Sequence, residues 1–105
     1  MEFKEIIDRA LRIREKYRKL EKARYGREWT REELAMGFVG DVGDLMKLVQ
    51  SKEGIRKAQD VDSKLAHELS DCLWSIIVLA NKYDIDLEKS FVKTMDYLEK
   101  KTSKG

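Results

Sequence analysis

The chain has 105 residues and a mass of 12.3 kDa, so residues 1–105 are predicted to form one domain. Charged residues make up 40% of the chain, and the net charge is only +2. Proline is absent and glycine appears six times, which excludes collagen-like, proline-rich and turn-rich β-sandwich proteins. One cysteine and one histidine exclude an internal disulfide and a Cys/His zinc site.

The first predicted helix is about 20 residues long and ends near Gly26, since glycine is favoured just after a helix. Its apolar stripe consists of Phe3, Ile6, Ile7, Ala10, Tyr17 and Leu20. Residues 9–27 carry nine Lys/Arg and only two acidic residues. We interpret this basic face as solvated, with salt bridges to another subunit, and a phosphate-attracting rim is the alternative. No base-stacking or groove-reading module accompanies the charge, which argues against nucleic-acid binding.

A second helix is predicted to start after Thr30, which forms a T-x-x-E capping box with Glu33, and to run to about Gln50. Three glycines inside it destabilise a helix by roughly 1 kcal/mol each relative to alanine. Because Gly37, Gly40 and Gly43 recur every three residues, they predict a smooth strip that another helix or a ligand approaches closely. Residues 51–62 read as a loop with one helical turn around residues 55–58.

A third helix is predicted from about Ser63 to Tyr83 and should be the most buried, since it is apolar almost all round. Asp86 is expected to cap a fourth helix, and residues 100–105 are expected to fray. No strand pattern is present. The fold class is therefore all-α, as a four-helix bundle. The longest apolar run, residues 76–80, cannot cross a bilayer, and no signal peptide begins the chain, so a cytoplasmic protein without a membrane anchor is expected.

Two acidic pairs lie inside or beside the apolar stripes of the two central helices, where a bundle should be apolar. Asp41 and Asp44 are three residues apart on the second helix, and Glu68 and Asp71 have the same spacing on the third. If the pairs face each other, two carboxylates 5 Å apart repel by roughly 3 kcal/mol. A raised pKa or a bound cation relieves this repulsion, and all-oxygen ligands suit Mg²⁺, with Mn²⁺ as the alternative.

The segment Gly40-Asp-Val-Gly-Asp-Leu45, followed by Glu68-Leu-Ser-Asp71, resembles the ExxE…ExxD signature of the MazG-like, all-α nucleoside triphosphate pyrophosphohydrolases. That family includes dimeric dUTPases and eukaryotic dCTP pyrophosphatases. The resemblance covers residues 25–99. It implies Mg²⁺-dependent cleavage of a nucleoside triphosphate between the α and β phosphates, giving a monophosphate and pyrophosphate. It also implies a homodimer or homotetramer, with a neighbouring subunit completing the nucleotide pocket.

Carried over by position, the resemblance makes Asp41, Asp44, Glu68 and Asp71 the catalytic metal ligands, with a carboxylate of the first pair as an alternative water-orienting group. The family usually has glutamate in the first pair, so the side chains here are one methylene shorter.

Other substrate contacts implied by the resemblance lie outside the acidic pairs. Tyr25 and Trp29 stand near where related dCTP pyrophosphatases place base-contacting aromatics, although a Trp before a capping box also suits a hydrophobic staple. In the last helix the family often carries a Lys and an Asn that contact the nucleotide, and this chain has Thr94 and Leu98 at those two positions. Asp96 is retained. Lys93 is the candidate replacement for the missing lysine side chain.

Three further residues have simpler interpretations: Trp74 as core packing, His67 as a surface histidine and Cys72 as an inert buried thiol. The main alternative to an enzyme is a non-catalytic helical interaction module whose acids form salt bridges to a partner's basic helix. A di-iron carboxylate bundle is disfavoured because no Glu-x-x-His motif is present.

Overall fold

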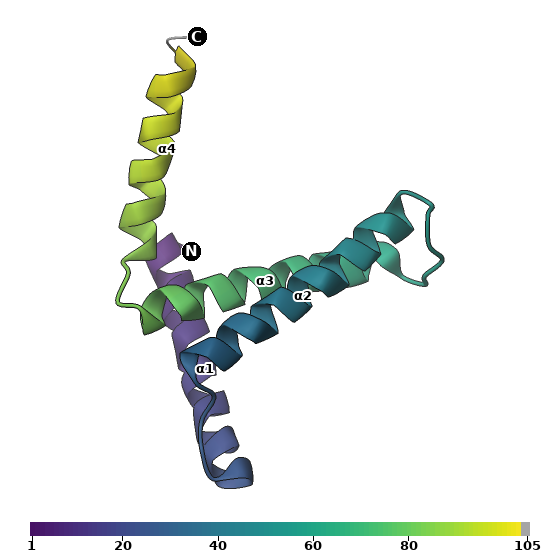
Figure 1. Ribbon diagram of the computed structural model, residues 1–105. Coiled ribbons are helices and arrows are strands. Elements are labelled where there is room, and N and C mark those ends of the chain that lie inside the picture. Colours follow the sequence, from purple (N-terminus) through teal and green to yellow (C-terminus); the bar gives the residue numbers. More distant parts are fainter. Residues whose placement is uncertain (104–105) are drawn as a thin grey trace.

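A computed structural model describes residues 1–103 and consists of four helices joined by short connections (Figure 1). The helices are α1 (Phe3–Tyr25), α2 (Arg31–Lys52), α3 (Val61–Lys82) and α4 (Leu87–Ser103). Residues 1–103 contain no β-strand, so the expected all-α class is confirmed.

The helix ends follow the predicted local signals. Gly26 ends α1 with φ 77° and donates its amide to the Lys22 carbonyl at 3.0 Å. Thr30 and Glu33 form the predicted capping box, with Glu33 N donating to Thr30 Oγ1 at 3.1 Å and Thr30 N to Glu33 Oε1 at 3.0 Å. Asp86 accepts the Lys89 amide at 3.0 Å at the start of α4.

Two local expectations were wrong. Residues 55–58 form no helical turn, because Gly54 has φ 82° and turns the chain out of the helical conformation directly after α2. Residues 100–103 do not fray; α4 continues to Ser103, whose hydroxyl donates to the Glu99 carbonyl at 2.8 Å. The expectation for residues 104 and 105 lies outside the described residues.

The helices α2 and α3 lie side by side as an antiparallel hairpin, which is the main packing unit of the chain (Figure 1). The helix α1 crosses this hairpin near the start of α2, and Trp74 of α3 donates its indole N–H to the Ala10 carbonyl at 3.0 Å. Among residues 1–103, the buried apolar side chains come from α3, as predicted: Cys72, Ile77, Val78 and Ala80.

The helix α4 packs against the end of α3, its first residues border a pocket with α1, and the rest extends away from the hairpin (Figure 1). One chain therefore supplies the four helices of the predicted bundle without closing them around a common core. The accessible surface is 8475 Å², whereas a compact 12.3 kDa monomer exposes about 6,100 Å². The radius of gyration is 16.8 Å, against about 13 Å for a compact domain of this length.

The glycine strip of α2 is open in the single chain. A Cβ placed on Gly37, Gly40 or Gly43 would meet no atom within 4 Å. The close approach predicted for this strip is therefore not made by another helix of the same chain. Any group that uses the strip has to come from outside the chain.

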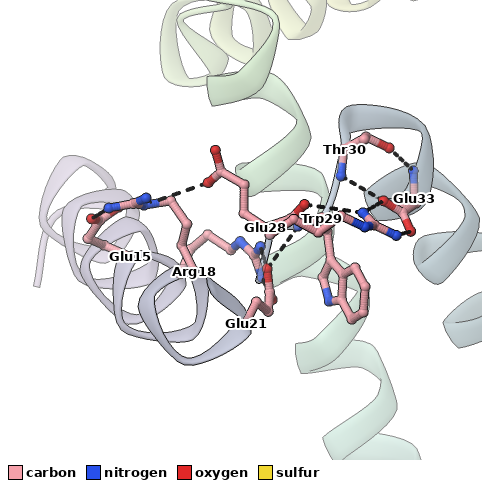
Figure 2. A network of polar contacts seen from close by, with 9 residues as sticks. Glu15, Arg18, Glu21, Glu28, Trp29, Thr30 and Glu33 are labelled. Carbon is pink, nitrogen blue, oxygen red and sulfur yellow. Dashed lines mark hydrogen bonds and ion pairs between the residues drawn. The ribbon is translucent and has the colours of Figure 1, made fainter. Parts of the chain in front are cut away.

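One buried acidic residue of α1, Glu21, attaches this helix to the segment just before α2 (Figure 2). Glu21 is only 7% exposed. Its carboxylate accepts hydrogen bonds from both terminal nitrogens of Arg14, at 2.6 and 2.7 Å, and from the Trp29 backbone N–H at 3.1 Å. Burial alone would raise the pKa of Glu21, but these donors hold the pKa below its ordinary value. Sequence reasoning did not single out Glu21.

Among the described residues, none of the helices has the length and apolar character needed to span a lipid bilayer.

Candidate metal-binding site

Three of the four predicted acidic residues meet between α2 and α3. One carboxylate oxygen from each of Asp41, Asp44 and Glu68 lies within 4.8 Å of the others. The i, i+3 spacing turns both aspartates toward α3, and the antiparallel pairing brings Glu68 opposite them. Ser75 of α3 donates its hydroxyl to Asp41 Oδ2 at 3.3 Å, which helps to hold that carboxylate in place.

The electrostatics of this cluster are unfavourable without a cation. Burial, followed by repulsion from Asp71, Asp44 and Asp41, raises the pKa of Glu68 above its ordinary value. The Oε2 atom of Glu68 is buried and has no hydrogen-bond partner. A buried carboxylate oxygen without a donor destabilises the fold unless something else satisfies it.

A divalent cation fits these residues. The donor set is entirely carboxylate oxygen, which is the chemistry that Mg²⁺ and Mn²⁺ prefer. A cation among Asp41, Asp44 and Glu68 would satisfy the Glu68 Oε2 atom and neutralise the repulsion that raises the Glu68 pKa.

Asp71, the fourth predicted ligand, lies outside this group of three. Its Oδ2 atom is 3.2 Å from His67 Nε2 on the preceding turn of α3. It remains close enough to raise the pKa of Glu68. Asp71 therefore adds negative charge near the cluster. The residue itself lies on the side of α3 that α1 covers, where it lines a pocket with Trp74 of α3 and Ala10 of α1.

A pocket of about 530 Å³ adjoins the cluster on the side of the α2–α3 loop. Asp44 and Glu68 form one part of its wall, and Lys47 and Lys64 form another. Sequence reasoning did not single out these lysines. The signal was present, because Lys47 follows Asp44 by three residues and Lys64 precedes Glu68 by four, so each lies one helical turn from a carboxylate.

The predicted aromatic contacts lie at the junction of α1 and α2. The rings of Tyr25 and Trp29 stack with centroids 5.4 Å apart, and the Arg27 guanidinium lies 5.5 Å from the Trp29 ring centre. These aromatic side chains border a pocket of about 200 Å³. Asp41 lies ten residues into α2, about 15 Å along the helix axis from this junction.

The predicted contacts on the last helix do not reach the cluster within one chain. Lys93 and Asp96 belong to α4, which extends away from α2 (Figure 1). Asp96 borders a separate pocket with residues nearer the C-terminal end of α4. Either side chain would meet an acidic cluster only if α4 approached another copy of the chain.

The simpler interpretations of three residues agree with the structure. Cys72 is buried, and this burial, with the nearby carboxylates, raises the pKa of its thiol. The Trp74 ring packs against Tyr17, with ring centroids 5.6 Å apart. The His67 side chain is 71% exposed, as expected for a surface histidine.

Comparison with known proteins agrees with this geometry. A family model described as the MazG nucleotide pyrophosphohydrolase domain matches residues 29–104, which contain the whole acidic cluster. The Gene 37 protein of Mycobacterium phage L5 is 28% identical over 76 residues, covering 69% of this chain and 66% of that protein. The chain thus spans just under two thirds of this relative's length. No solved structure matches the chain.

Proposed function

Because the chain belongs to the family of MazG nucleotide pyrophosphohydrolase domains, we propose that it is a Mg²⁺-dependent enzyme that cleaves a nucleoside triphosphate between the α and β phosphates. One observation carries the proposal. The buried, unpartnered Glu68 Oε2 atom belongs to a carboxylate that lies within 4.8 Å of two others. Such a site is strained when empty and relieved by a cation, as expected of a metal-dependent hydrolase that acts in the cytoplasm.

The cluster residues have distinct roles in this proposal. Asp41, Asp44 and Glu68 hold the cation, and Asp71 adds negative charge from the next turn. When bound, Mg²⁺ supplies positive charge that stabilises the phosphate oxygens in the transition state. Asp41, positioned by Ser75, is the alternative candidate for accepting a hydrogen bond from the attacking water.

The proposed reaction is a hydrolysis without any redox change. The water oxygen forms a bond to the α phosphorus, and the bond from the α phosphorus to the α–β bridging oxygen breaks. The electron pair of that bond leaves with pyrophosphate, and the two protons of the water pass to the products or to the solvent. The products are a nucleoside monophosphate and pyrophosphate.

The alternative of a non-catalytic interaction module is less well supported. It requires the acidic residues to form salt bridges with the basic first helix of a partner subunit, whereas the Glu68 Oε2 atom is already buried within its own chain. The basic residues of α1 that do form ion pairs use other carboxylates, such as Glu15 and Glu21.

We further propose that the working unit is a homodimer or homotetramer. The chain exposes an apolar surface, which we call the outer hairpin face, on α2 and α3; its residues are Met46, Val49, Leu69, Leu73 and Ile76, each at least 38% exposed. By helical periodicity they share one side of the hairpin. The chain exposes about 2,400 Å² more surface than a compact monomer of the same mass. This area is similar to the area that one subunit buries in an obligate interface.

The decisive experiment is a panel of nucleoside triphosphates incubated with Mg²⁺, with pyrophosphate and orthophosphate measured separately. We expect pyrophosphate and a nucleoside monophosphate from at least one substrate, and no turnover with Glu68→Gln. Release of orthophosphate alone would contradict cleavage between the α and β phosphates. Wild-type turnover by Glu68→Gln would remove the acidic cluster from the mechanism.

A further inference from the structure

The pocket beside the acidic cluster is lined by both acidic and basic side chains, which together suit a metal-bound polyphosphate. Its lining includes Asp44 and Glu68 from the cluster and Lys47 and Lys64 from the same two helices. The carboxylates suit a cation, and the ammonium groups suit the negative oxygens of phosphate. Both types of side chain border one open volume of about 530 Å³.

The lysines are available for a ligand. Among residues 1–103, neither Lys47 nor Lys64 forms an ion pair, although other lysines of the chain do, for example Lys52 with Asp62 at 2.5 Å. The two lysines therefore do not neutralise the acidic cluster. The Glu68 Oε2 atom has no hydrogen-bond partner although these two lysines line the same pocket.

The positions of the lysines along the hairpin give the pocket a direction. Lys47 follows Asp44 on α2 and Lys64 precedes Glu68 on α3, and the two helices are antiparallel. Both lysines are therefore displaced from the carboxylates in the same direction, toward the α2–α3 loop, by about one helical turn of 5.4 Å. A chain of phosphates that starts at the cation would reach the two ammonium groups with its far end.

We propose that Lys47 and Lys64 bind the terminal phosphates of the substrate, which become the pyrophosphate leaving group, so that the triphosphate lies along the hairpin with its tail toward the α2–α3 loop. This inference rests on the proposed function for the identity of the substrate. The nucleoside then lies on the side of the cluster nearer α1. The direct test uses inorganic pyrophosphate, whose binding requires no hydrolysis.

The test compares the wild type with Lys47→Gln, Lys64→Gln and the double variant. Calorimetry measures the Kd of inorganic pyrophosphate in saturating Mg²⁺. We expect each single variant to weaken binding about tenfold and the double variant to weaken it more, since each loses a charge-assisted hydrogen bond to phosphate. Lys47→Arg should retain most of the affinity.

Two controls isolate the effect of the lysines. Lys57→Gln removes an exposed lysine of the α2–α3 loop that does not line the pocket, so its Kd should stay within twofold of the wild type. The shift in melting temperature produced by Mg²⁺ alone should persist in all the lysine variants. In steady-state assays, inhibition by pyrophosphate should weaken in the double variant while inhibition by the nucleoside monophosphate stays the same.

Each outcome decides between the two proposals. Pyrophosphate affinity within twofold of the wild type in the double variant would overturn the lysine assignment, even if Glu68→Gln abolishes hydrolysis. A wild type that binds no pyrophosphate in Mg²⁺ would also overturn it. Lysine-dependent pyrophosphate binding without hydrolysis of any nucleoside triphosphate would support the lysine assignment and contradict the enzymatic function.

Discussion

Glu68 is the residue at which stability and function conflict. Its pKa is raised by burial and by neighbouring carboxylates, so in the absence of a cation its ionised form is less stable than that of a free glutamate. The same carboxylate supplies the unpartnered oxygen of the proposed metal site. A side chain that binds a cation is therefore expected to destabilise the metal-free fold.

We predict that Glu68→Gln raises the melting temperature of the metal-free protein by a few degrees, because the amide removes a repelled charge and keeps the side-chain size. Mg²⁺ at one hundred times Kd should stabilise the wild type by about 2.7 kcal/mol and leave Glu68→Gln unchanged. Asp71→Asn should retain part of the Mg²⁺ response, because its carboxylate lies outside the group of three. Equal Mg²⁺ responses in the wild type and Glu68→Gln would refute a preformed site.

A second prediction at the residue scale concerns Glu21. Glu21→Gln should reduce the free energy of unfolding by about 2 kcal/mol, because Arg14 would keep a buried charge without its counterion. Urea unfolding measures this difference. Glu15→Gln is the matched control, since Glu15 forms an exposed pair with Arg18 on the same helix; its effect should stay below about 0.5 kcal/mol. Similar losses in both variants would show that the buried pair has no special role.

The capping box at the start of α2 is expected to make the stability of the fold depend on pH in the acidic range. The Arg27 guanidinium, with the Thr30 amide, lowers the pKa of Glu33 from 4.5 to about 2. A lowered folded-state pKa stabilises the protein above the unfolded pKa, and the contribution is lost as pH falls from about 4.5 to about 2. We expect the melting temperature of the wild type to fall more steeply over this window than that of Glu33→Gln. Parallel pH curves would contradict the prediction.

The exposed glycine strip of α2 allows two substitutions with opposite expected effects. Gly40→Ala should stabilise the protein by up to about 1 kcal/mol, because helix propensity improves and the new Cβ meets no atom. Gly40 precedes Asp44 by one turn on the same side of α2, so a larger side chain would narrow the entrance to the cluster. Gly40→Leu should therefore fold normally and lose about tenfold in turnover. Full activity with leucine would show that no ligand passes over this strip.

In the whole molecule, the outer hairpin face is expected to be covered by a second copy. Leu73→Glu should convert the oligomer to a monomer, because it places a charge at the centre of that face, where Leu73 is 46% exposed. Light scattering coupled to size-exclusion chromatography measures the mass. Lys57→Glu, in the exposed α2–α3 loop, is the control and should leave the mass unchanged. A monomeric wild type would refute the proposed assembly.

The sequence by itself determined the helices and the residue pairs that matter most. Gly26, the Thr30–Glu33 box and Asp86 act within a few residues, so their effects can be read without knowing the fold, and all three end or begin a helix as predicted. The acidic pairs were found for the same reason, because i, i+3 spacing places side chains on one face of any helix.

Only the tertiary structure decided which groups meet. It separated Asp71 from the other three acidic residues, brought Lys64 of α3 to the pocket that Asp44 and Lys47 of α2 line, and placed Glu21 beside the Trp29 amide. These relations depend on how α1 crosses the hairpin and on the register between α2 and α3. Local spacing cannot supply either, since crossing angle and register are set by packing between residues distant in the chain. The extension of α4 away from the hairpin has the same origin, because its apolar face does not find a complete partner within one chain.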